Sequence, residues 1–324
     1  MHPRYTDKEH FYHDLSRLLA SGIPLQRAVG HLAAGRDRVG RLASAAANYL
    51  PEGVGRALDR AGFGPMDAEI LEAGERSGRF QEACSLLAEY YARLAESRRR
   101  LLAACAYPVF LLHFGVVVLA VPVAILGGGF PAFVFHVVTT LGMFYAAALV
   151  AWGLAGVARR SARTSAGAER LLRWIPGISG LFSTGTLARY CMVLSMGIRS
   201  ATGIAVSLER AGRACGSASM DAASKDAVEL IRQGDTFAGS LRSTGAFPKD
   251  LERAFEVSEA SGRLEEETTR WAEIYRERFN ARLAATAEWL PRILYILIAA
   301  FIAQRIFSVV SNVYGAFSNV LGTE

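Results

Sequence analysis

The hydrophobic positions divide the chain into amphipathic stretches and wholly apolar ones. Early in the chain, apolar residues recur every three or four positions between breaks at glycine and proline, which is the spacing of one helix face. The stripe that starts at Phe80 meets no breaker before Pro108. A second stripe starts at Leu264 and again leads into an apolar segment. We therefore predict an all-α protein in which each series of short helices ends in one long helix.

The longest apolar block, residues 101–158, contains no Asp, Glu, Lys or Arg. A helix that crosses a bilayer needs about 20 apolar residues, so the block has room for a hairpin of two spans. We expect spans at about 102–126 and 132–157, joined by a turn at 127–131. In the second span, small residues recur every fourth position at Ala147, Ala151 and Ala155. Such a face favours close helix packing in lipid.

A third span is expected after Pro291, but Arg305 interrupts its apolar run. If the helix enters the bilayer at Arg292, Arg305 lies about 10 Å short of the far interface. A long side chain can partly cover that distance by snorkelling. A partner in the hairpin or a lipid phosphate would also satisfy the guanidinium, and these alternatives stay open.

Short phrases occur twice in the same order. Residues 72–80 read EAGERSGRF and residues 256–264 read EVSEASGRL, while SGIPL at 21–25 is echoed by TGIAV at 202–206. The offsets lie between 181 and 184, so a helical domain that ends in a membrane helix is repeated. The predicted parts are copy 1 at 1–101, the hairpin at 102–158, copy 2 at 159–289, and a third span with a short tail at 290–324.

The repeated phrase allows three interpretations. In the first, Ser77–Gly78 and Ser261–Gly262 end one helix and start the next, and Glu75 and Glu259 satisfy exposed amides at the junction. In the second, these residues contact a partner. In the third, the two glutamates together bind a metal.

Charge is concentrated at the edges of the apolar block. The formal net charge is +6, and arginines at 98–100 precede the block while Arg159, Arg160 and Arg163 follow it. Because cytoplasmic flanks are rich in Lys and Arg, we expect both copies in the cytoplasm and the hairpin loop outside. Basic residues are not interleaved with aromatic ones, so we expect no nucleic acid as a partner.

Catalytic patterns are missing from the sequence. It contains no GxxxxGK[ST], HExxH or GxSxG. The four cysteines are scattered, His10 and His13 have no evident third metal ligand, and the N-terminus lacks a signal-peptide pattern. His113 and His136 fall at different depths of the hairpin. We therefore expect no enzyme activity and no cofactor.

Several motifs in order carry a family resemblance. They are LLASGIPLQRAV at 18–29, GF at 62–63 before EAGERSGRF, YP at 107–108, LLRWIPGISGLFSTGTLARYCMVL at 171–194, FP at 247–248 before EVSEASGRL, and LP at 290–291. The chain resembles the F-domain proteins of type II secretion systems and type IV pilus machines over nearly its whole length. Two departures are Ser258 in place of Gly74 and Ala205 in place of Pro24.

The resemblance implies about six cytoplasmic helices per copy and three transmembrane helices in the bacterial inner membrane. It implies a platform that couples a cytoplasmic hexameric ATPase to the assembly of pilin or pseudopilin subunits. Other inner-membrane assembly proteins and further copies of the chain would be partners. The motif residues with a structural or partner role would be Gly22, Pro24, Gly74, Glu75, Ser77, Gly78, Pro108, Gly203, Glu259, Ser261, Gly262 and Pro291.

Other functions stay open at this point. A multipass transporter or channel component would need polar residues along a path through the spans. A membrane-bound enzyme or receptor is another alternative. Within the resembling group, a competence pilus or a tight-adherence secretion apparatus is a third, although the latter usually carries one copy of the domain per chain.

Overall fold

The computed structural model describes residues 3–127, 129–161, 167, 169 and 178–321. Gly128, Arg163 and residues 171–177 of the lead-in at 171–194 lie outside the described residues. All regular elements in the described part are helical, which confirms the all-α prediction. The first copy contains α1 (Tyr5–Ala20), α2 (Leu25–Ala33), α3 (Arg38–Ala47), η1 (Leu50–Glu52), α4 (Val54–Arg60), α5 (Pro65–Arg76) and the start of α6 (Phe80–Gly127).

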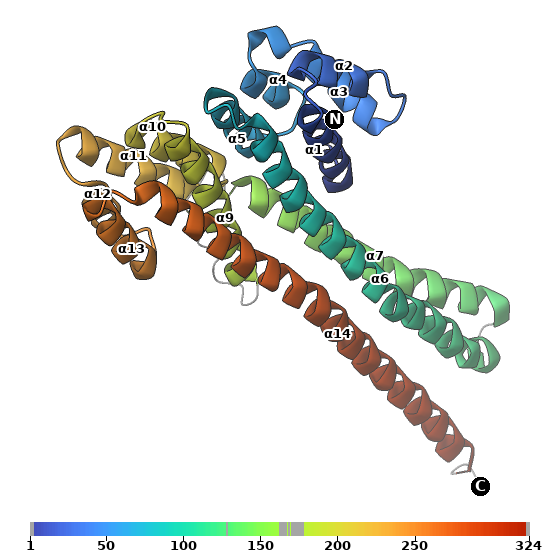
Figure 1. Cartoon of the computed structure of the whole chain (residues 1–324). Helices are drawn as coiled ribbons and strands as arrows, with labels where there is room; N and C mark the ends of the chain where they lie inside the picture. Colours follow the sequence, from blue (N-terminus) through green and yellow to red (C-terminus); the bar gives the residue numbers. More distant parts are fainter. Residues whose placement is uncertain (1–2, 128, 162–166, 168, 170–177, 322–324) are drawn as a thin grey trace. The chain divides into compact units, whose positions relative to one another are not determined.

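The second copy repeats this order after α7 (Gly129–Ser161) (Figure 1). Its helices are α9 (Ile178–Arg199), α10 (Ile204–Ala214), α11 (Ala218–Arg232), α12 (Phe237–Thr244), α13 (Lys249–Ala260) and the start of α14 (Leu264–Leu321). The predicted six helices per copy are therefore present. The long helices are unbroken at Pro108, Pro122 and Pro291, so each copy continues into an apolar segment without a loop.

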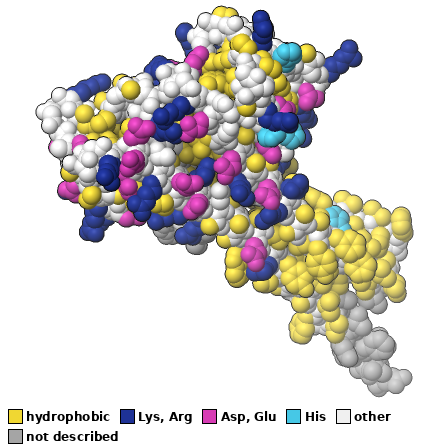
Figure 2. All heavy atoms as spheres, viewed as in Figure 1, with side chains coloured by type: hydrophobic (Ala, Val, Ile, Leu, Met, Phe, Trp, Pro, Cys, Tyr) yellow, Lys and Arg dark blue, Asp and Glu magenta, His cyan; other side chains and the backbone are white. Residues whose placement is uncertain are grey.

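The chain forms two compact units. Residues 1–96 and 158–283, which hold both helical copies, form the first, and residues 97–157 and 284–324 form the second. Charged side chains are spread over the surface of the first unit, whereas the visible face of the second is almost continuously hydrophobic (Figure 2). Within the part of the chain that the structure describes, three helices are long and apolar enough to cross a membrane, with spans inside 80–125, 129–157 and 264–308.

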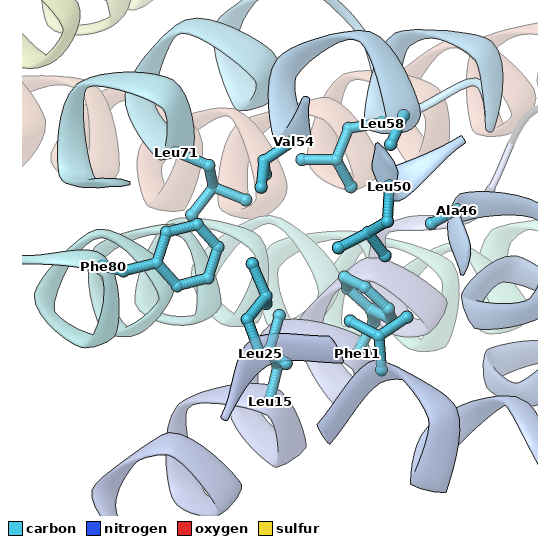
Figure 3. Close-up of a pocket in the computed structure, with 11 residues that line it drawn as sticks. Phe11, Leu15, Leu25, Ala46, Leu50, Val54, Leu58, Leu71 and Phe80 are labelled. Carbon is cyan, nitrogen blue, oxygen red and sulfur yellow. The ribbon is translucent and has the colours of Figure 1, made fainter. Parts of the chain in front are cut away.

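The core of copy 1 closes around the motif that ends α5. Side chains from its successive helices point toward one another, and Phe80, the last residue of EAGERSGRF, lies among them (Figure 3). Phe11, Leu15 and Leu71 from this group are fully buried. The lining is entirely apolar, so this region is a packing core rather than a site for a polar ligand.

A buried polar cluster ties three helices of copy 1 together. Lys8 of α1 donates to Asp67 of α5 at 2.8 Å, to the hydroxyl of Tyr91 of α6 at 3.0 Å, and to the carbonyl of Phe63. The Tyr91 hydroxyl donates to the other Asp67 oxygen at 2.7 Å. Burial raises the pKa of Asp67, and the Lys8 ammonium opposes that shift. A buried carboxylate is tolerated here because every oxygen has a donor.

The second copy replaces this cluster by apolar side chains. The residue equivalent to Asp67, 184 positions later, is Leu251, and Leu187 of α9 occupies the place of Lys8. Tyr275 is equivalent to Tyr91, but its buried hydroxyl lacks the carboxylate partner of Tyr91, and the Arg278 guanidinium lies over its ring, 5.2 Å from the centroid. The two copies therefore share a fold but stabilise the same helix junction by different means.

The structure shifts one equivalence predicted between the copies. The left-handed turn residue after α1 is Gly22, with φ +81°, and after α9 it is Ala201, with φ +53°. The residues that precede α2 and α10 are Pro24 and Gly203. The first two helices therefore align with an offset of 179, and pairing SGIPL with TGIAV at 181 is wrong by two residues. The sequence match misled because Gly203 takes the place of Pro24 and not that of Gly22.

The hairpin turn is also shorter than predicted. α6 ends at Gly127 and α7 begins at Gly129, so Phe130 and Pro131 lie in the first turn of the helix rather than in the loop. Proline is well accommodated there because its missing N–H would lack an intrahelical partner in any case. Gly129 has φ +62°, which a residue with a side chain rarely adopts.

Within the second unit, α6 and α14 pack closely. A Cβ on Gly115 would lie 2.6 Å from Cδ1 of Ile302, so a larger residue there would require the Ile302 side chain to move. Leu112, Val116 and Ile298 are buried around it. Phe144 of α7 meets Phe301 edge-on, with ring centroids 4.9 Å apart. In lipid, the hydrophobic effect does not drive helices together. They associate instead through close packing, which small residues make possible.

The polar cluster predicts a specific mutational pattern. Lys8→Leu or Asp67→Leu alone leaves a buried charge unpaired and should cost about 3–5 kcal/mol of stability. The double variant recreates the arrangement of copy 2 and should lose less than either single variant. Heat-induced reaction of the buried thiols of Cys84, Cys191 and Cys215 with a fluorogenic reagent reports unfolding. Losses that simply add in the double variant would contradict the pairing.

Candidate functional site

The repeated phrase forms the same turn in both copies. In copy 1 the amide of Arg79 donates to the carbonyl of Gly74 at 2.8 Å, and Gly78 to Glu75 at 3.2 Å. In copy 2 the equivalent bonds, from Arg263 to Ser258 and from Gly262 to Glu259, have the same lengths. This is a Schellman ending, in which the left-handed residue is a glycine. Gly78 and Gly262 have φ of +67° and +71°.

Close packing explains why residue 74 is a glycine in copy 1, whereas the equivalent residue of copy 2 is a serine. A Cβ on Gly74 would lie 2.6 Å from the Cβ of Ala83 in α6, closer than real side chains approach. Ser258 stands at this place in copy 2, buried, with its hydroxyl bonded to the carbonyl of Phe255. The long helices therefore approach the turn more closely in copy 1 than in copy 2.

The two motif glutamates do different things. The Glu259 carboxylate accepts from the backbone amides of Phe237 and Ala238, at 2.7 and 2.9 Å, at the start of α12. It therefore caps a neighbouring helix rather than the α13–α14 junction that the sequence suggested. The Glu75 side chain is exposed, and its carboxylate has no hydrogen bond or ion pair with another described residue.

Metal or thiol chemistry finds no support at these motifs. In the described part of the chain, no group of three or more His, Cys, Asp and Glu residues is placed to hold a metal ion. All four cysteines are free thiols, and burial raises the pKa of Cys84 and Cys191 above the ordinary range. His10 and His13 are exposed on α1.

An arginine–carboxylate contact joins the two copies. Arg210 of α10 donates to Glu69 at 3.1 Å and to Glu72 at 3.3 Å, both on α5. Arg213 approaches Glu69 at 3.6 Å. Burial raises the pKa of Glu69, and Arg210 opposes the shift. Because the Arg210 and Glu69 side chains are each only 17% exposed, this contact is worth more than a surface ion pair.

The contact continues along the long helices. Arg199 of α9 binds Glu82 of α6, and Arg276 of α14 binds Glu89 of α6 at 3.0 Å. Tyr90 of α6 stacks on Phe279 of α14 with ring centroids 6.2 Å apart. The interface therefore pairs acids of copy 1 mainly with arginines of copy 2 around a stacked aromatic pair, and Arg79 of copy 1 approaches Glu265 of α14 at 3.7 Å in the opposite sense.

Two polar features lie in the membrane unit. His113 of α6 hydrogen-bonds the carbonyl of Val109 through Nδ1 at 2.7 Å, and its Nε2 lies 2.8 Å from the hydroxyl of Tyr145 in α7. The Nδ1 bond requires the proton on that nitrogen, so in the neutral ring Nε2 is the acceptor for the tyrosine hydroxyl. This bond joins the two helices of the hairpin.

The second feature is Arg305. Its guanidinium lies 5.7 Å from the centroid of the Phe301 ring, the ring that meets Phe144 of α7. A cation over an aromatic face is stabilised by the ring quadrupole, and more strongly away from water. Of the expected small-residue face on α7, Ala147 and Ala151 are exposed and Ala155 is half-buried.

Comparison with known proteins addresses the family. Residues 11–128 and 190–311 match the family described as Type II secretion system (T2SS), protein F. The chain belongs to this family. Each matched segment begins in the first helix of a copy and runs into a membrane helix, so the protein F domain occurs twice. The resemblance predicted from the motifs is confirmed.

A relative of the protein F chain supports the same assignment. The chain is similar to the type IV pilus assembly protein PilC of Pseudomonas aeruginosa, with 24% identity over 260 residues. The match covers 72% of this chain and 68% of that protein. The protein F family and the three apolar helices together make this a multi-pass membrane protein.

The sequence motifs did not identify Lys8, Asp67 or Arg210, which form the main polar contacts of the first unit. Lys8 lies on the same helix face as Phe11 and Leu15, so a charge at a core position was visible in the sequence. Asp67 lies likewise one turn before Leu71. Arg210 and its partners carried no signal, because they are ordinary surface residues of two amphipathic helices that the sequence does not bring together.

Exchanging the motif residues between copies tests the close approach at Gly74. Gly74→Ser forces Ala83 or the turn to move and should cost about 1–3 kcal/mol. The matched exchange Ser258→Gly only loosens a helix end and should cost about 1 kcal/mol or less. Thermal thiol exposure measures both. Equal losses would mean that the α5–α6 junction relaxes freely.

Proposed function

We propose that this chain is an inner-membrane platform that couples a cytoplasmic hexameric ATPase to the assembly of pilin or pseudopilin subunits. The observation that carries the proposal is architectural. Two protein F domains in one chain each continue into a membrane-spanning segment through an unbroken helix, α6 or α14. A continuous helix resists bending, so displacement of a domain is passed to its span rather than absorbed in a loop.

The topology follows the arginine distribution. Both copies face the cytoplasm, where the ATPase can reach them, and the hairpin turn lies on the far side of the inner membrane. The role is mechanical and not enzymatic. The platform works as a homo-oligomer, together with other inner-membrane proteins of the same machine.

The repeated motif is available for partner contact in copy 1 but not in copy 2. Glu75 is exposed at the end of α5, while the equivalent Glu259 is occupied in capping α12. The exposed motif of copy 1 is therefore the better candidate for partner contact. The exposed small-residue face of α7 is the candidate for the transmembrane helix of a pilin or pseudopilin, since small side chains let a second helix approach closely.

Affinity purification from gently solubilised native membranes tests the function. Recovery of a secretion-type ATPase together with pilin-like small proteins is the expected result. A tagged unrelated inner-membrane protein, treated identically, is the control. If the folded chain brings neither and instead conducts a solute in liposomes, the protein is a transporter or channel component and the proposal fails.

The α7 face makes a sharper prediction. Ala151→Leu adds bulk where a partner helix would approach, so pilus or secretion assembly should fall about tenfold while the protein level stays constant. Val150→Leu enlarges the neighbouring exposed position off that face and should leave assembly unchanged. Assembly measured as surface-exposed subunits compares the two variants. Equal assembly in the two variants would show that α7 is not the docking face.

A further inference from the structure

The contact between the two copies uses different surfaces on each. Besides the long helices α6 and α14, which also meet, copy 1 contributes α5 and copy 2 contributes α9 and α10. In terms of the repeated domain, the fifth helix of one copy packs on the first two helices of the other. A contact between unlike surfaces is heterologous, and it leaves one of each surface unused at the two ends.

The unused surface of copy 2 is the stripe of α13 equivalent to the interface stripe of α5. We call it the α13 face, and it consists of Arg253, Glu256, Val257 and Ala260, the equivalents of Glu69, Glu72, Ala73 and Arg76. All four are exposed. The contrast is clearest for the apolar pair, since Ala73 is 5% exposed whereas Val257 is 70% exposed.

The unused surface of copy 1 lies on α1 and α2. We call it the α1–α2 face, and it consists of Ala20, His31 and Ala34. With the offset of 179, these are the equivalents of Arg199, Arg210 and Arg213, which bind copy 1 acids. All three are exposed. Where the internal interface has arginines, this face therefore has small or weakly basic side chains.

We propose that a second copy of this chain docks its α13 face onto the α1–α2 face. The partner is a second copy because the chain already makes this contact once internally, and the two faces are its remaining halves. In the repeated contact His31 stands opposite Glu256, as Arg210 stands opposite Glu72. Val257 and Ala260 are then covered by the alanines of the α1–α2 face.

The residue differences between the internal interface and the two unused faces also determine how strong the interchain contact is. Arg253 takes the place of Glu69, and the Glu256 carboxylate already pairs with Arg242 of α12 in its own copy. The interchain contact lacks the arginine–carboxylate bonds of the internal one, so it is weaker and depends on Val257. It does not depend on what the platform assembles, and it can fail while the proposed function stands.

Disulfide trapping between differently tagged chains tests this contact. One chain carries His31→Cys and the other Glu256→Cys, and both are co-expressed and oxidised mildly in native membranes. The expected product is a disulfide-linked heterodimer at least about tenfold more abundant than with a matched control pair, His31→Cys with Gln233→Cys, whose second position is exposed at the end of α11. Chains with only the native cysteines give the background.

A second substitution separates a specific contact from chance collision. Val257→Arg in the Glu256→Cys chain should lower the heterodimer about tenfold without changing thermal thiol exposure. Equal trapping in the control pair, or dimers only between two His31→Cys chains, would overturn the head-to-tail contact. Loss of assembly on Val257→Arg without any interchain disulfide would assign the α13 face to a different protein and also overturn it.

Discussion

The arginine–carboxylate contact between the two copies determines the organisation of the first unit. Two small helical domains separated in sequence by a membrane hairpin have no covalent reason to pack together. Arg210 provides a non-covalent link, because its planar guanidinium reaches two carboxylates of α5 at once and is largely shielded from water. The aromatic stack between α6 and α14 extends the same contact toward the spans. The long helices α6 and α14 therefore both start in one packed unit rather than in two separate domains.

Duplication did not preserve the interior chemistry of the domain. The helix junction that copy 1 closes with a buried lysine and aspartate is closed in copy 2 with leucines, and the motif glutamate caps a helix in one copy only. Residues that set the backbone, such as Gly78 and Gly262, are equivalent in both. The turn geometry is therefore common to the domain, while polar groups inside it are free to diverge once each is satisfied locally.

Much of this architecture follows from the sequence. Helical periodicity, the charge-free block and the repeated phrase predict the element order, the three spans and the family. The turns ending α5 and α13 are predictable because only glycine readily adopts the left-handed conformation at Gly78 and Gly262. The offset near Gly22 was misread, since identical letters there stand at different places in the turn. The Arg210 contact and the His113–Tyr145 bond could not be predicted, because each joins helices whose relative rotation no local pattern specifies.

The buried cluster of copy 1 also constrains how the chain is made. Lys8 emerges first during synthesis, Asp67 follows, and Tyr91 completes the set only ten residues before the apolar block begins at Leu101. At about 5–20 residues per second, the lysine waits several seconds for its last partner. The first domain can therefore close only as the hydrophobic hairpin is being delivered to the membrane. Because Tyr91 is the last partner to be made, completion of this cluster is followed directly by synthesis of the first span.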